Sequence, residues 1–576
     1  MTTQIRWRDW SAEAFDEAQR DDKPILLSIG AVWCHWCHVM DRTSYADEHV
    51  AATIERSYVP VRVDTDQRPD VNARYNLGGW PTTALLTPEG EVLSGATYVP
   101  PKELRALLEE VSDAYHLHRA TIAVELNERA RRMRERHVPD GAALDASILT
   151  TTREAIVTTY DAEYGGFGDA PKFPQPAALD FLLLLLERAP DAEIEAILSK
   201  TLVAMARGGM YDHIEGGFFR YSTTRDWTLP HFEKMADDHA GLLPLYARAW
   251  QRLGIPSLRE TVVATVRYLR LVLRDPATGF FAGSQDADEV YYAFPLDERR
   301  ERQAPFVDRT VYTNFNAALV SAFLRSAHVL EDETLAAEGL ATLDALEAQM
   351  RDERGLYFHF RRPGGTPELP NLLADQVAVL RAFLDAHELG GQRRFRVRAA
   401  ELAERICEIF TDADGTLVDH VNADDFGRMS WRDHPLDDNA LAADSLLRLA
   451  AMTGDSAPAE RALKILEAFS RSYAAARSFA APYASAVARA LYGGTSVAIV
   501  GERGADALRD VALRLPDPFV TVATFAADDP TLQVRGLRPP RDGALAYVCR
   551  GRVCAAPVGD AAAMRSAFDA RPGEET

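Results

Sequence analysis

Two cysteines, Cys34 and Cys37, stand between a strand-like stretch and a helix-like stretch near the start of this chain. The apolar run at 25–31 predicts a buried strand, and the segment Trp-Cys-His-Trp-Cys-His at 33–38 leads into a helix. The N-terminus of a helix carries unpaired N–H groups and a partial positive charge, which favour a thiolate over a thiol. We therefore predict that Cys34 is a nucleophile and that Cys37, one turn later, resolves the mixed disulfide.

The neighbouring segments continue an alternating pattern of helices and strands. A helix is expected around 11–21, and further strands are expected at 58–64, after Pro81, and at 91–98. Gly-Gly-Trp before Pro81 predicts a strained turn with a cis peptide bond. A strand that feeds a Cys-x-x-Cys helix is typical of the thioredoxin fold, in which such a proline faces the cysteines. Trp36 and Pro81 are therefore expected to contact a substrate. A charged connector helix over about 101–136 would end this thioredoxin-like domain, residues 1–136.

Other interpretations of the cysteine motif remain open. Cys34-x-x-Cys37-His38 also matches the attachment signature of c-type haem, and cysteines with histidines can bind zinc. Haem attachment normally needs an exported domain, and the side chains of one helical turn cannot all converge on one tetrahedral ion. A fold retained for packing, with idle thiols, is a further alternative. We expect no metal and no cofactor. The aspartate-rich segment 64–70 would place carboxylates near the thiols or cap the following helix.

Residues 145–492 predict helices with almost no strands. The expected helices lie near 147–160, 176–188, 191–208, 230–253, 257–274, 314–329, 333–351, 371–389, 394–411, 437–453, 457–475 and 479–492. A weak repeat of aspartate, glycine and an aromatic residue punctuates them, and its glycines are 166, 217, 279, 355 and 415. One helical hairpin with a loop per repeat predicts an (α/α)6 toroid whose loops gather at one end. An open helical solenoid is the alternative to this closed barrel.

The last part of the chain, residues 493–576, predicts a small α/β region. Strands are expected at 495–501 and 544–550, with a helix at 505–514. Cys549 and Cys554 fall on the last hairpin-like segment. We expect a packing or incidental role for them in preference to a second redox pair.

Three segments of the toroid, 167–174, 211–235 and 284–289, are dense in chemically active residues. A helix that begins at Pro230 would carry His231, Lys234 and Asp238 on one face. That face would project acid–base groups into a cavity, or it would simply be the solvated face of an amphipathic helix. Paired aspartates such as Asp286 and Asp288 can serve sugar chemistry, and they are equally common as loop caps. The predicted catalytic residues of the toroid are His231, Glu233, Asp238 and Asp286, and the predicted ligand contacts are Lys172, Arg220, Tyr221, Lys234 and Asp288.

Length and charge limit the possible functions. A chain of 576 residues should hold several domains, and its net charge of −22 argues against general binding to nucleic acids or anionic membranes. The longest apolar run, 181–186, is too short to span a bilayer, and residues 1–7 lack the apolar core of a secretory signal. Five cysteines do not make a disulfide scaffold for a chain of this size. We expect a cytoplasmic location, with Cys34 and Cys37 mostly reduced at rest.

Several separate stretches of the chain, in order, resemble the thioredoxin-domain-containing family that includes bacterial YyaL and mammalian spermatogenesis-associated protein 20. The matching stretches are 33–38, 63–64, 68–70, 79–81, 87–88, 170–174, 220–222, 230–235 and 286–288. The resemblance implies a thioredoxin-like domain joined to a six-hairpin toroid like those of glycosidases and sugar epimerases. Phe219 stands where the family usually has a histidine, which argues against an epimerase-like acid–base pair. The stretch between Asn72 and Gly78 is also shorter than usual, which would open the thiol site.

The leading hypothesis is a cytoplasmic protein of two modules. The thioredoxin-like module acts through Cys34 and Cys37 on a thiol partner protein, while the toroid binds a small polar or carbohydrate-like ligand. The first alternative is a sugar isomerase, epimerase or glycoside hydrolase that acts in the toroid, with the thioredoxin unit structural. The second alternative is a non-catalytic binding or scaffold protein. Neither a nucleic acid nor a membrane is expected as a partner.

Overall fold

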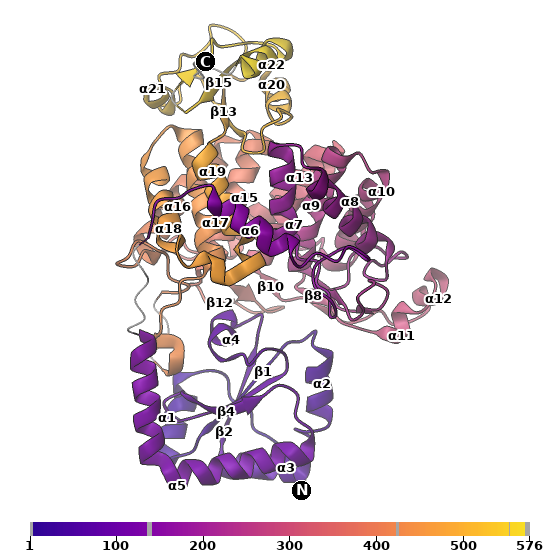
Figure 1. Ribbon diagram of the computed structural model, residues 1–576, viewed down its shortest axis with the longest axis vertical. Helices are drawn as coiled ribbons and strands as arrows, with labels where there is room; N and C mark the ends of the chain where they lie inside the picture. The colour runs from indigo at the N-terminus through magenta and orange to yellow at the C-terminus, as the bar shows by residue number, and fades with distance from the viewer. Residues whose placement is uncertain (1–3, 135–140, 422–425, 552, 571–576) are drawn as a thin grey trace. The chain divides into compact units, whose positions relative to one another are not determined.

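The computed structural model describes residues 4–134, 141–421, 426–551 and 553–570 (Figure 1). The chain forms two compact units. The first comprises Met1–Val138 together with two short distant segments, Gln285–Ala287 and Asp419–Asp433, and the second comprises the remainder. In these ranges no helix has the length and apolar character needed to cross a bilayer.

A four-stranded mixed sheet forms the centre of the first unit. Its order is β2-β1-β3-β4, with β1 parallel to β2 and antiparallel to β3. Alternate side chains of β1 face opposite layers: Leu27 packs with α1 and α4, and Leu26 packs with α3 and α5. The predicted thioredoxin-like arrangement is thereby confirmed. The elements are α1 (Ala12–Asp21), β1 (Ile25–Gly30), α2 (His35–Arg42), α3 (Glu48–Ser57), β2 (Val59–Asp64), α4 (Pro69–Tyr75), β3 (Thr82–Leu86), β4 (Val92–Ala96) and α5 (Pro101–Arg134).

Helix α5 corresponds to the predicted connector and bends at His118, whose backbone leaves the helical range (Figure 1). The prediction extended this helix to residue 136, and positions 135 and 136 lie outside the described residues.

A distant segment completes one face of the first unit. Phe426 packs against Phe15 with ring centroids 4.7 Å apart, and Met429 is buried in the same core. The backbone N–H of Arg428 donates to the hydroxyl of Tyr75 at 2.7 Å. The sequence analysis placed segment 419–433 in the toroid. Its apolar side chains instead cover the sheet of the thioredoxin-like domain.

An inner and an outer set of helices form most of the second unit. Each inner helix packs against the next, and α19 returns to α7, so the inner ring is closed and the open solenoid is excluded. In the described part of the chain, the inner helices are α7 (Pro176–Arg188), α9 (Ala236–Leu253), α13 (Thr313–Leu330), α15 (Leu373–Gly390), α17 (Leu436–Thr453) and α19 (Ala481–Tyr492). The outer helices are α6 (Ser147–Val157), α8 (Ala192–Arg207), α10 (Pro256–Tyr268), α14 (Glu333–Gln349), α16 (Arg393–Phe410) and α18 (Ala457–Phe469).

The repeated glycine loops are tied to the inner helices by one recurring contact. A polar side chain in the first turn of the inner helix accepts the backbone N–H of the residue that ends the preceding loop. Asn316 binds Phe281, Gln376 binds Tyr357 and Asn439 binds Leu417, at 2.7 to 2.8 Å. His239 binds Phe218 in the same way at 2.8 Å. These contacts gather the loops at the end of the barrel where the inner helices begin, as the sequence predicted.

Short strands and helical turns lie between the long helices and differ from the predicted pattern, which had almost no strands. Helix α9 begins at Ala236, whereas the sequence analysis began a helix at Pro230. His231 and Lys234 therefore lie on strands β6 and β7, and the predicted shared helical face with Asp238 is wrong. The short elements are β5 (Tyr221–Ser222), β6 (Pro230–His231), β7 (Lys234–Met235), η1 (Leu269–Leu273), β8 (Ser284–Gln285), α11 (Glu289–Tyr292), α12 (Leu296–Arg300), β9 (Val307–Asp308), β10 (Val311–Tyr312), β11 (Phe360–Arg361), β12 (Pro367–Glu368), η2 (Gly427–Ser430) and η3 (Tyr473–Ala480).

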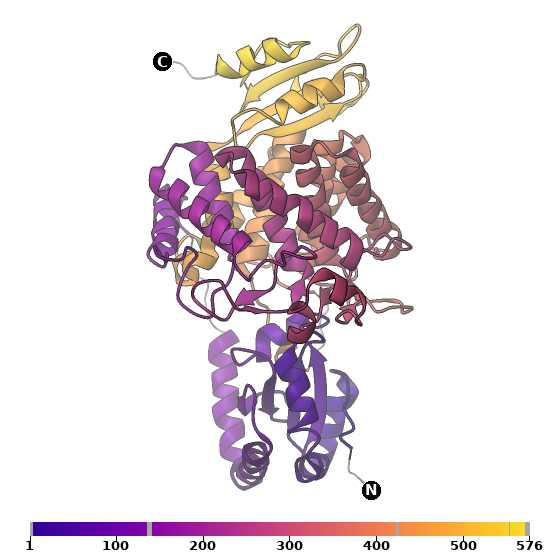
Figure 2. The ribbon, with the colours of Figure 1, turned by 90° about the vertical axis from the view of Figure 1, so that its right-hand side faces the viewer.

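The C-terminal region is a small α/β layer that packs on the toroid (Figure 2). Its sheet has the order β14-β13-β15-β16. The guanidinium of Arg396 on α16 binds the buried carboxylate of Asp529 at 2.5 Å, which ties this layer to the helices. The elements are β13 (Thr495–Val500), α20 (Ala505–Ala512), β14 (Thr521–Phe525), α21 (Thr531–Arg535), β15 (Leu545–Arg550), β16 (Val553–Cys554) and α22 (Ala561–Asp569).

Candidate functional site

The cysteine pair lies at the start of α2, in the form of a disulfide. Cys34 is the N-cap residue of the helix, and its Sγ accepts the backbone N–H of Cys37 at 3.2 Å. Only about one twentieth of each residue is exposed, 5% for Cys34 and 7% for Cys37. An N-cap position directs unpaired helix N–H groups at the sulfur, so a thiolate at Cys34 would be stabilised there.

Two aspartates hold the loop between β1 and α2. The carboxylate of Asp64 accepts the backbone N–H groups of Val32 at 3.1 Å, of Asp66 at 2.9 Å and of Gln67 at 3.1 Å. The carboxylate of Asp66 accepts the indole N–H of Trp33 at 2.6 Å. The sequence left open whether segment 64–70 lies near the thiols or caps a helix. These hydrogen bonds place its first two carboxylates on the cysteine loop, where they hold Val32 and Trp33, the two residues before Cys34.

Pro81 and Gly30 lie together beside the pair. The peptide bond between Trp80 and Pro81 is cis, as predicted. Pairing of Ile29 with Thr82 brings Pro81 next to the end of β1. A Cβ atom added to Gly30 would lie 3.3 Å from Sγ of Cys37, so a side chain at this position would press on the disulfide. The small residue at the end of β1 therefore makes room for the sulfur.

The side chains between and after the cysteines face different surroundings. Trp36 is 50% exposed and lies against Tyr98, with ring centroids 5.2 Å apart. Nδ1 of His38 lies 4.0 Å from the carboxylate of Asp286. Asp286 belongs to the short segment Gln285–Ala287, which is part of the first unit. Asp286 was predicted as an acid or base for sugar chemistry. The structure places it beside the cysteine helix, a relationship that no local sequence pattern indicates.

The toroid brings together a second group of predicted residues. Nδ1 of His231 contacts the carboxylate of Glu233, and the His231 ring stacks on Tyr221 with centroids 4.9 Å apart. Tyr221 in turn stacks on Phe173 at 4.7 Å. Glu233 is buried, whereas the His231 side chain keeps 20% of its surface exposed. The rings of Phe173, Tyr221 and His231 thus form one stack, and the carboxylate of Glu233 contacts the imidazole at its end.

The structure places Lys172 and Lys234, which were predicted to contact a ligand, in the protein interior. Both are fully buried, and each ammonium group binds an aspartate and a carbonyl oxygen of a glycine loop. Lys172 binds Asp161 at 2.7 Å, and Lys234 binds Asp212 at 2.8 Å. Burial without a partner would be costly for these charges, and the aspartates offset that cost. The same contact in two successive repeats favours a structural role for Lys172 and Lys234 over the predicted contact with a ligand.

The remaining predicted residues fall into two groups. Asp288 caps α11 by accepting the backbone N–H of Tyr291 at 2.9 Å, so the loop-cap alternative describes it. Asp238 lies in the first turn of α9, where burial and the neighbouring charge of Asp237 raise its pKa well above the usual range. Arg220 opposes this effect on both carboxyl groups. Asp238 therefore shares a charged environment with Arg220 at the loop end of the barrel.

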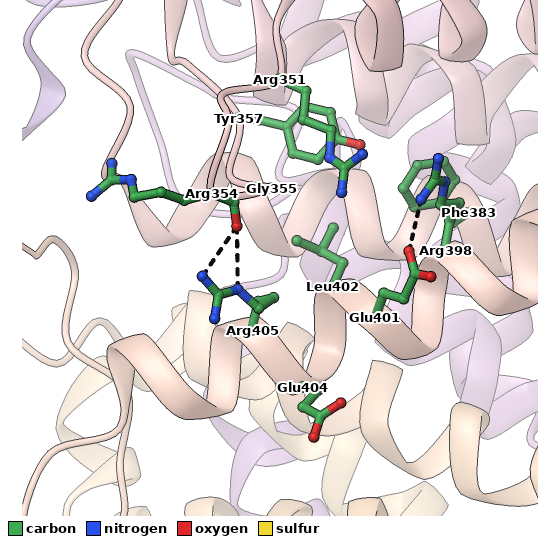
Figure 3. A pocket seen from close by; sticks show the side chains of 10 residues that line it. All are labelled: Arg351, Arg354, Gly355, Tyr357, Phe383, Arg398, Glu401, Leu402, Glu404 and Arg405. Carbon is green, nitrogen blue, oxygen red and sulfur yellow. Dashed lines mark hydrogen bonds and ion pairs between the residues drawn. The ribbon is translucent and has the colours of Figure 1, made fainter.

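A cavity of about 260 Å³ lies elsewhere in the second unit, on the outer helix α16 and the preceding glycine loop (Figure 3). It is lined by arginines and by the buried rings of Tyr357 and Phe383, and it contains none of the predicted site residues. Among the described residues, no group of three or more His, Cys, Asp or Glu side chains is arranged to hold a metal ion.

Comparison with known proteins bears on the first unit most directly. The family model "Thioredox_DsbH: Protein of unknown function, DUF255" matches residues 1–134. A thioredoxin of Alicyclobacillus acidocaldarius is 27% identical over 97 residues, 17% of this chain and 90% of that protein. The N-terminal part of the chain is thus similar to this family and to a thioredoxin, and the predicted resemblance is confirmed.

The whole chain is similar to spermatogenesis-associated protein 20. The human protein is 25% identical over 706 aligned residues, which cover 97% of this chain and 89% of that protein. The mouse protein is 34% identical over 311 residues, 49% of this chain and 39% of that protein.

Solved structures similar to the helical part include a D-mannose isomerase, with a TM-score of 0.49 and 9% identity over 60% of this chain and 96% of that one. The cellobiose 2-epimerase of Bacillus thermoamylovorans has a TM-score of 0.47 and 12% identity over 56% of this chain and 86% of that one.

Proposed function

We propose that the chain is a thiol–disulfide oxidoreductase that acts through Cys34 and Cys37 on a partner protein. The observation that supports this most strongly is the position of Cys34 at the N-cap of α2, with its Sγ accepting the N–H of Cys37. A sulfur in this position gains charge-stabilising contacts as a thiolate, and the second sulfur is its disulfide partner.

The exchange proceeds in two steps. The Cys34 thiolate attacks a disulfide of the partner; a bond forms between the two sulfurs, and the other partner sulfur leaves as a thiolate that takes up a proton. The Cys37 thiolate then attacks Sγ of Cys34, and the first partner sulfur leaves and is protonated. The pair ends as a disulfide and the partner as a dithiol, with the two protons transferred from the cysteines. A dithiol reductant restores the pair, which accords with the cytoplasmic location predicted from the sequence.

Binding of the partner falls to residues around the pair. Trp36, half exposed between the cysteines, offers an apolar ring to an extended peptide, and Pro81 lies beside the end of β1. Both were predicted to contact a substrate, and both keep that role in this proposal.

The experiment uses the full chain with its other cysteines, Cys407, Cys549 and Cys554, replaced by serine. The alkylation rate of reduced Cys34 against pH should give a pKa well below the reference of about 8.5 for a free cysteine. Reduction of a fluorescent glutathione disulfide should require Cys34, and Cys37→Ser should accumulate the mixed disulfide. A Cys34 pKa at the reference value, with the same turnover in Cys34→Ser, would refute the proposal.

A second candidate function is sugar isomerisation or epimerisation in the toroid, with His231 as the base. The contact of Nδ1 with Glu233 leaves Nε2 of His231 as the atom that can accept a proton, because the carboxylate orients the ring. The stacked rings of Phe173, Tyr221 and His231 suit contact with a sugar face. In this candidate Arg220 and Asp238 bind the polar ligand.

Exchange of sugar protons with solvent deuterium tests this candidate. Reducing sugars incubated with the protein in D2O should lose the NMR signal of the proton next to the carbonyl carbon. His231→Gln should abolish the exchange, while His213→Gln, a change of an exposed histidine in the same loop region, should leave it unchanged. Absence of exchange and of any thermal shift across the sugar panel would end this candidate without affecting the first.

A further inference from the structure

The C-terminal sheet repeats the topology of the N-terminal one. In both sheets the first strand is central, parallel to the second and antiparallel to the third, and the fourth strand is at the edge beyond the third. In both, a helix follows the first strand after four residues: α2 begins at His35 after Gly30, and α20 begins at Ala505 after Val500. Helices α20 and α22 cover one face of the C-terminal sheet, as α3 and α5 cover one face of the N-terminal sheet.

The two modules differ at the point where the first helix begins. The N-terminal module has Cys34 as N-cap, whereas the C-terminal module has Gly504 there, with a φ of 89°. The loop 501–504 contains no cysteine. The C-terminal module therefore cannot carry out thiol–disulfide exchange at the N-terminus of its first helix.

The second module instead carries a disulfide at the other end of its sheet. Cys549 on β15 lies directly opposite Cys554 on β16, and the two are bonded. Cys549 also pairs with Ser496 near the start of β13, while Val500 at the end of β13 pairs with Leu545. The bond therefore lies away from the loop 501–504. The sequence analysis expected a packing or incidental role for these cysteines in preference to a second redox pair, and it did not predict that the strand register places them opposite each other.

The two sulfurs of this bond are unequally accessible. Cys549 is 1% exposed because β15 lies between β13 and β16, whereas Cys554 is exposed on the edge strand. An attacking thiolate must approach one sulfur from the side opposite the other. Since Cys549 lies inward, the approach to Cys554 comes from solvent. The bond also closes a loop of only a few residues, so it constrains the unfolded chain little and is poorly suited as a structural staple.

We propose that the Cys549–Cys554 bond is a second thiol–disulfide exchange site, reduced by a protein dithiol through attack on Cys554. A thiolate of the dithiol attacks Sγ of Cys554, the bond to Cys549 breaks, and Cys549 leaves as a thiolate that is protonated. The second thiol of the reductant, as a thiolate, then attacks the sulfur bound to Cys554, and Cys554 leaves and is protonated. The dithiol is oxidised to a disulfide, and the hairpin holds two thiols that carry its two protons.

The test uses the full chain with Cys34, Cys37 and Cys407 replaced by serine, so that its outcome is independent of the first site. After oxidation in air, mass spectrometry with differential alkylation should find the two remaining cysteines bonded. Dithiothreitol should reduce them without denaturant, while the circular dichroism spectrum and the melting temperature show that the fold is retained. The proposal would be overturned if both cysteines remained free thiols after oxidation in air, or if dithiothreitol reduced the bond only after the protein had unfolded.

Single variants in that background test which sulfur is attacked. Cys549→Ser leaves Cys554, which should form a mixed disulfide with biotin-labelled oxidised glutathione. Cys554→Ser leaves the buried Cys549, which should react at least about tenfold more slowly because its sulfur is shielded. Equal rates, or faster reaction of Cys549, would contradict attack on Cys554. A second arm uses another variant as the reductant. This variant retains Cys34 and Cys37, carries Cys549→Ser and Cys554→Ser, and is reduced beforehand so that it serves as the dithiol. Reduction in this arm identifies a second copy of this chain as a competent reductant, and reduction by dithiothreitol alone points to another protein dithiol.

Discussion

The guanidinium of Arg74 binds the carboxylate of Asp419 through two hydrogen bonds of 2.8 and 3.3 Å, although 345 positions separate the two residues. Arg74 also donates to the carbonyl oxygen of Trp431 at 2.5 Å. Both side chains are largely shielded from solvent, so the pair is more than a surface salt bridge. It holds the segment 419–433 on α4 of the thioredoxin-like domain, whose core is incomplete without that segment.

Truncation of Met429 should therefore destabilise the thioredoxin-like domain. Met429→Ala is expected to lower the free energy of unfolding of this unit by about 2–5 kcal/mol, because a fully buried methionine is lost from its core. Urea unfolding followed by the fluorescence of Trp10, which lies in the same core, measures the change. Ser430→Ala, at the neighbouring exposed position, is the control and should change the free energy by less than about 0.5 kcal/mol. Equal effects of the two substitutions would contradict the insertion of this segment.

Removal of the Asp64 carboxylate should slow disulfide exchange at Cys34. Asp64→Ala leaves the backbone N–H of Val32 in the cysteine loop, and those of Asp66 and Gln67 after β2, without their acceptor, which costs about 1–3 kcal/mol for each group that stays buried. Asp64→Asn retains an acceptor oxygen and is expected to restore most of the rate. Reduction of a labelled glutathione disulfide measures exchange. A normal rate in Asp64→Ala would show that the loop holds its shape without these hydrogen bonds.

Two glycines with nearly the same φ angle allow the free-energy cost of a steric clash to be measured separately from the cost of the backbone conformation. Gly217 and Gly415 have φ values of 84° and 85°, but a Cβ at Gly217 would lie 2.6 Å from the Tyr268 ring, whereas at Gly415 nothing lies within 4 Å. Both alanine variants should lose about 1–2 kcal/mol from the left-handed backbone, and Gly217→Ala should lose about 1–3 kcal/mol more from the clash. Thermal unfolding compares them. Identical melting temperatures would place Tyr268 elsewhere in solution.

Stability should fall as the pH decreases from about 6.5 to about 4. Burial lowers the pKa of His239 to about 4, and its Nε2 must stay unprotonated to accept the N–H of Phe218. His387, also buried, has a pKa lowered to about 4 for the same reason. Between an unfolded pKa of about 6.5 and these values, the unfolded chain binds protons that the folded chain does not, so acid favours unfolding. The loss is on the order of 3 kcal/mol for each histidine and levels off below about pH 4.

The other repeats provide a matched variant for this pH dependence. Asn316, Gln376 and Asn439 make the same contact with an amide, so His239→Gln should fold and retain the hydrogen bond. Its unfolding free energy, measured by urea at several pH values, should fall less between pH 6.5 and 4 than that of the unaltered chain, by on the order of 3 kcal/mol. An unchanged slope would assign the dependence to other groups.

Local patterns in the sequence were sufficient for the long helices, for the main strands of the two small sheets and for their order. The twelve helices, the strand before Cys34 and the cis peptide before Pro81 depend on residues close together in the chain. The stacking of the hairpins also followed, because a repeated hairpin buries its apolar faces against copies of itself. The contact of α19 with α7 decided that the stack closes into a ring and excluded the open solenoid. For the same reason the glycine loops could be placed at one end of the barrel.

Contacts between distant residues depended on the tertiary structure. No periodicity marks Phe426 and Met429 as core residues of a domain that begins four hundred positions earlier. The burial of Lys172 and Lys234, and the place of Asp286 beside His38, depend on which loops meet in space. The pairing of Cys549 with Cys554 depends on strand register, which shifts every side chain to the other face if it slips by one residue. Short-range propensity thus determined the helices and strands, whereas the packing of remote segments decided which side chains share a core, a charge or a bond.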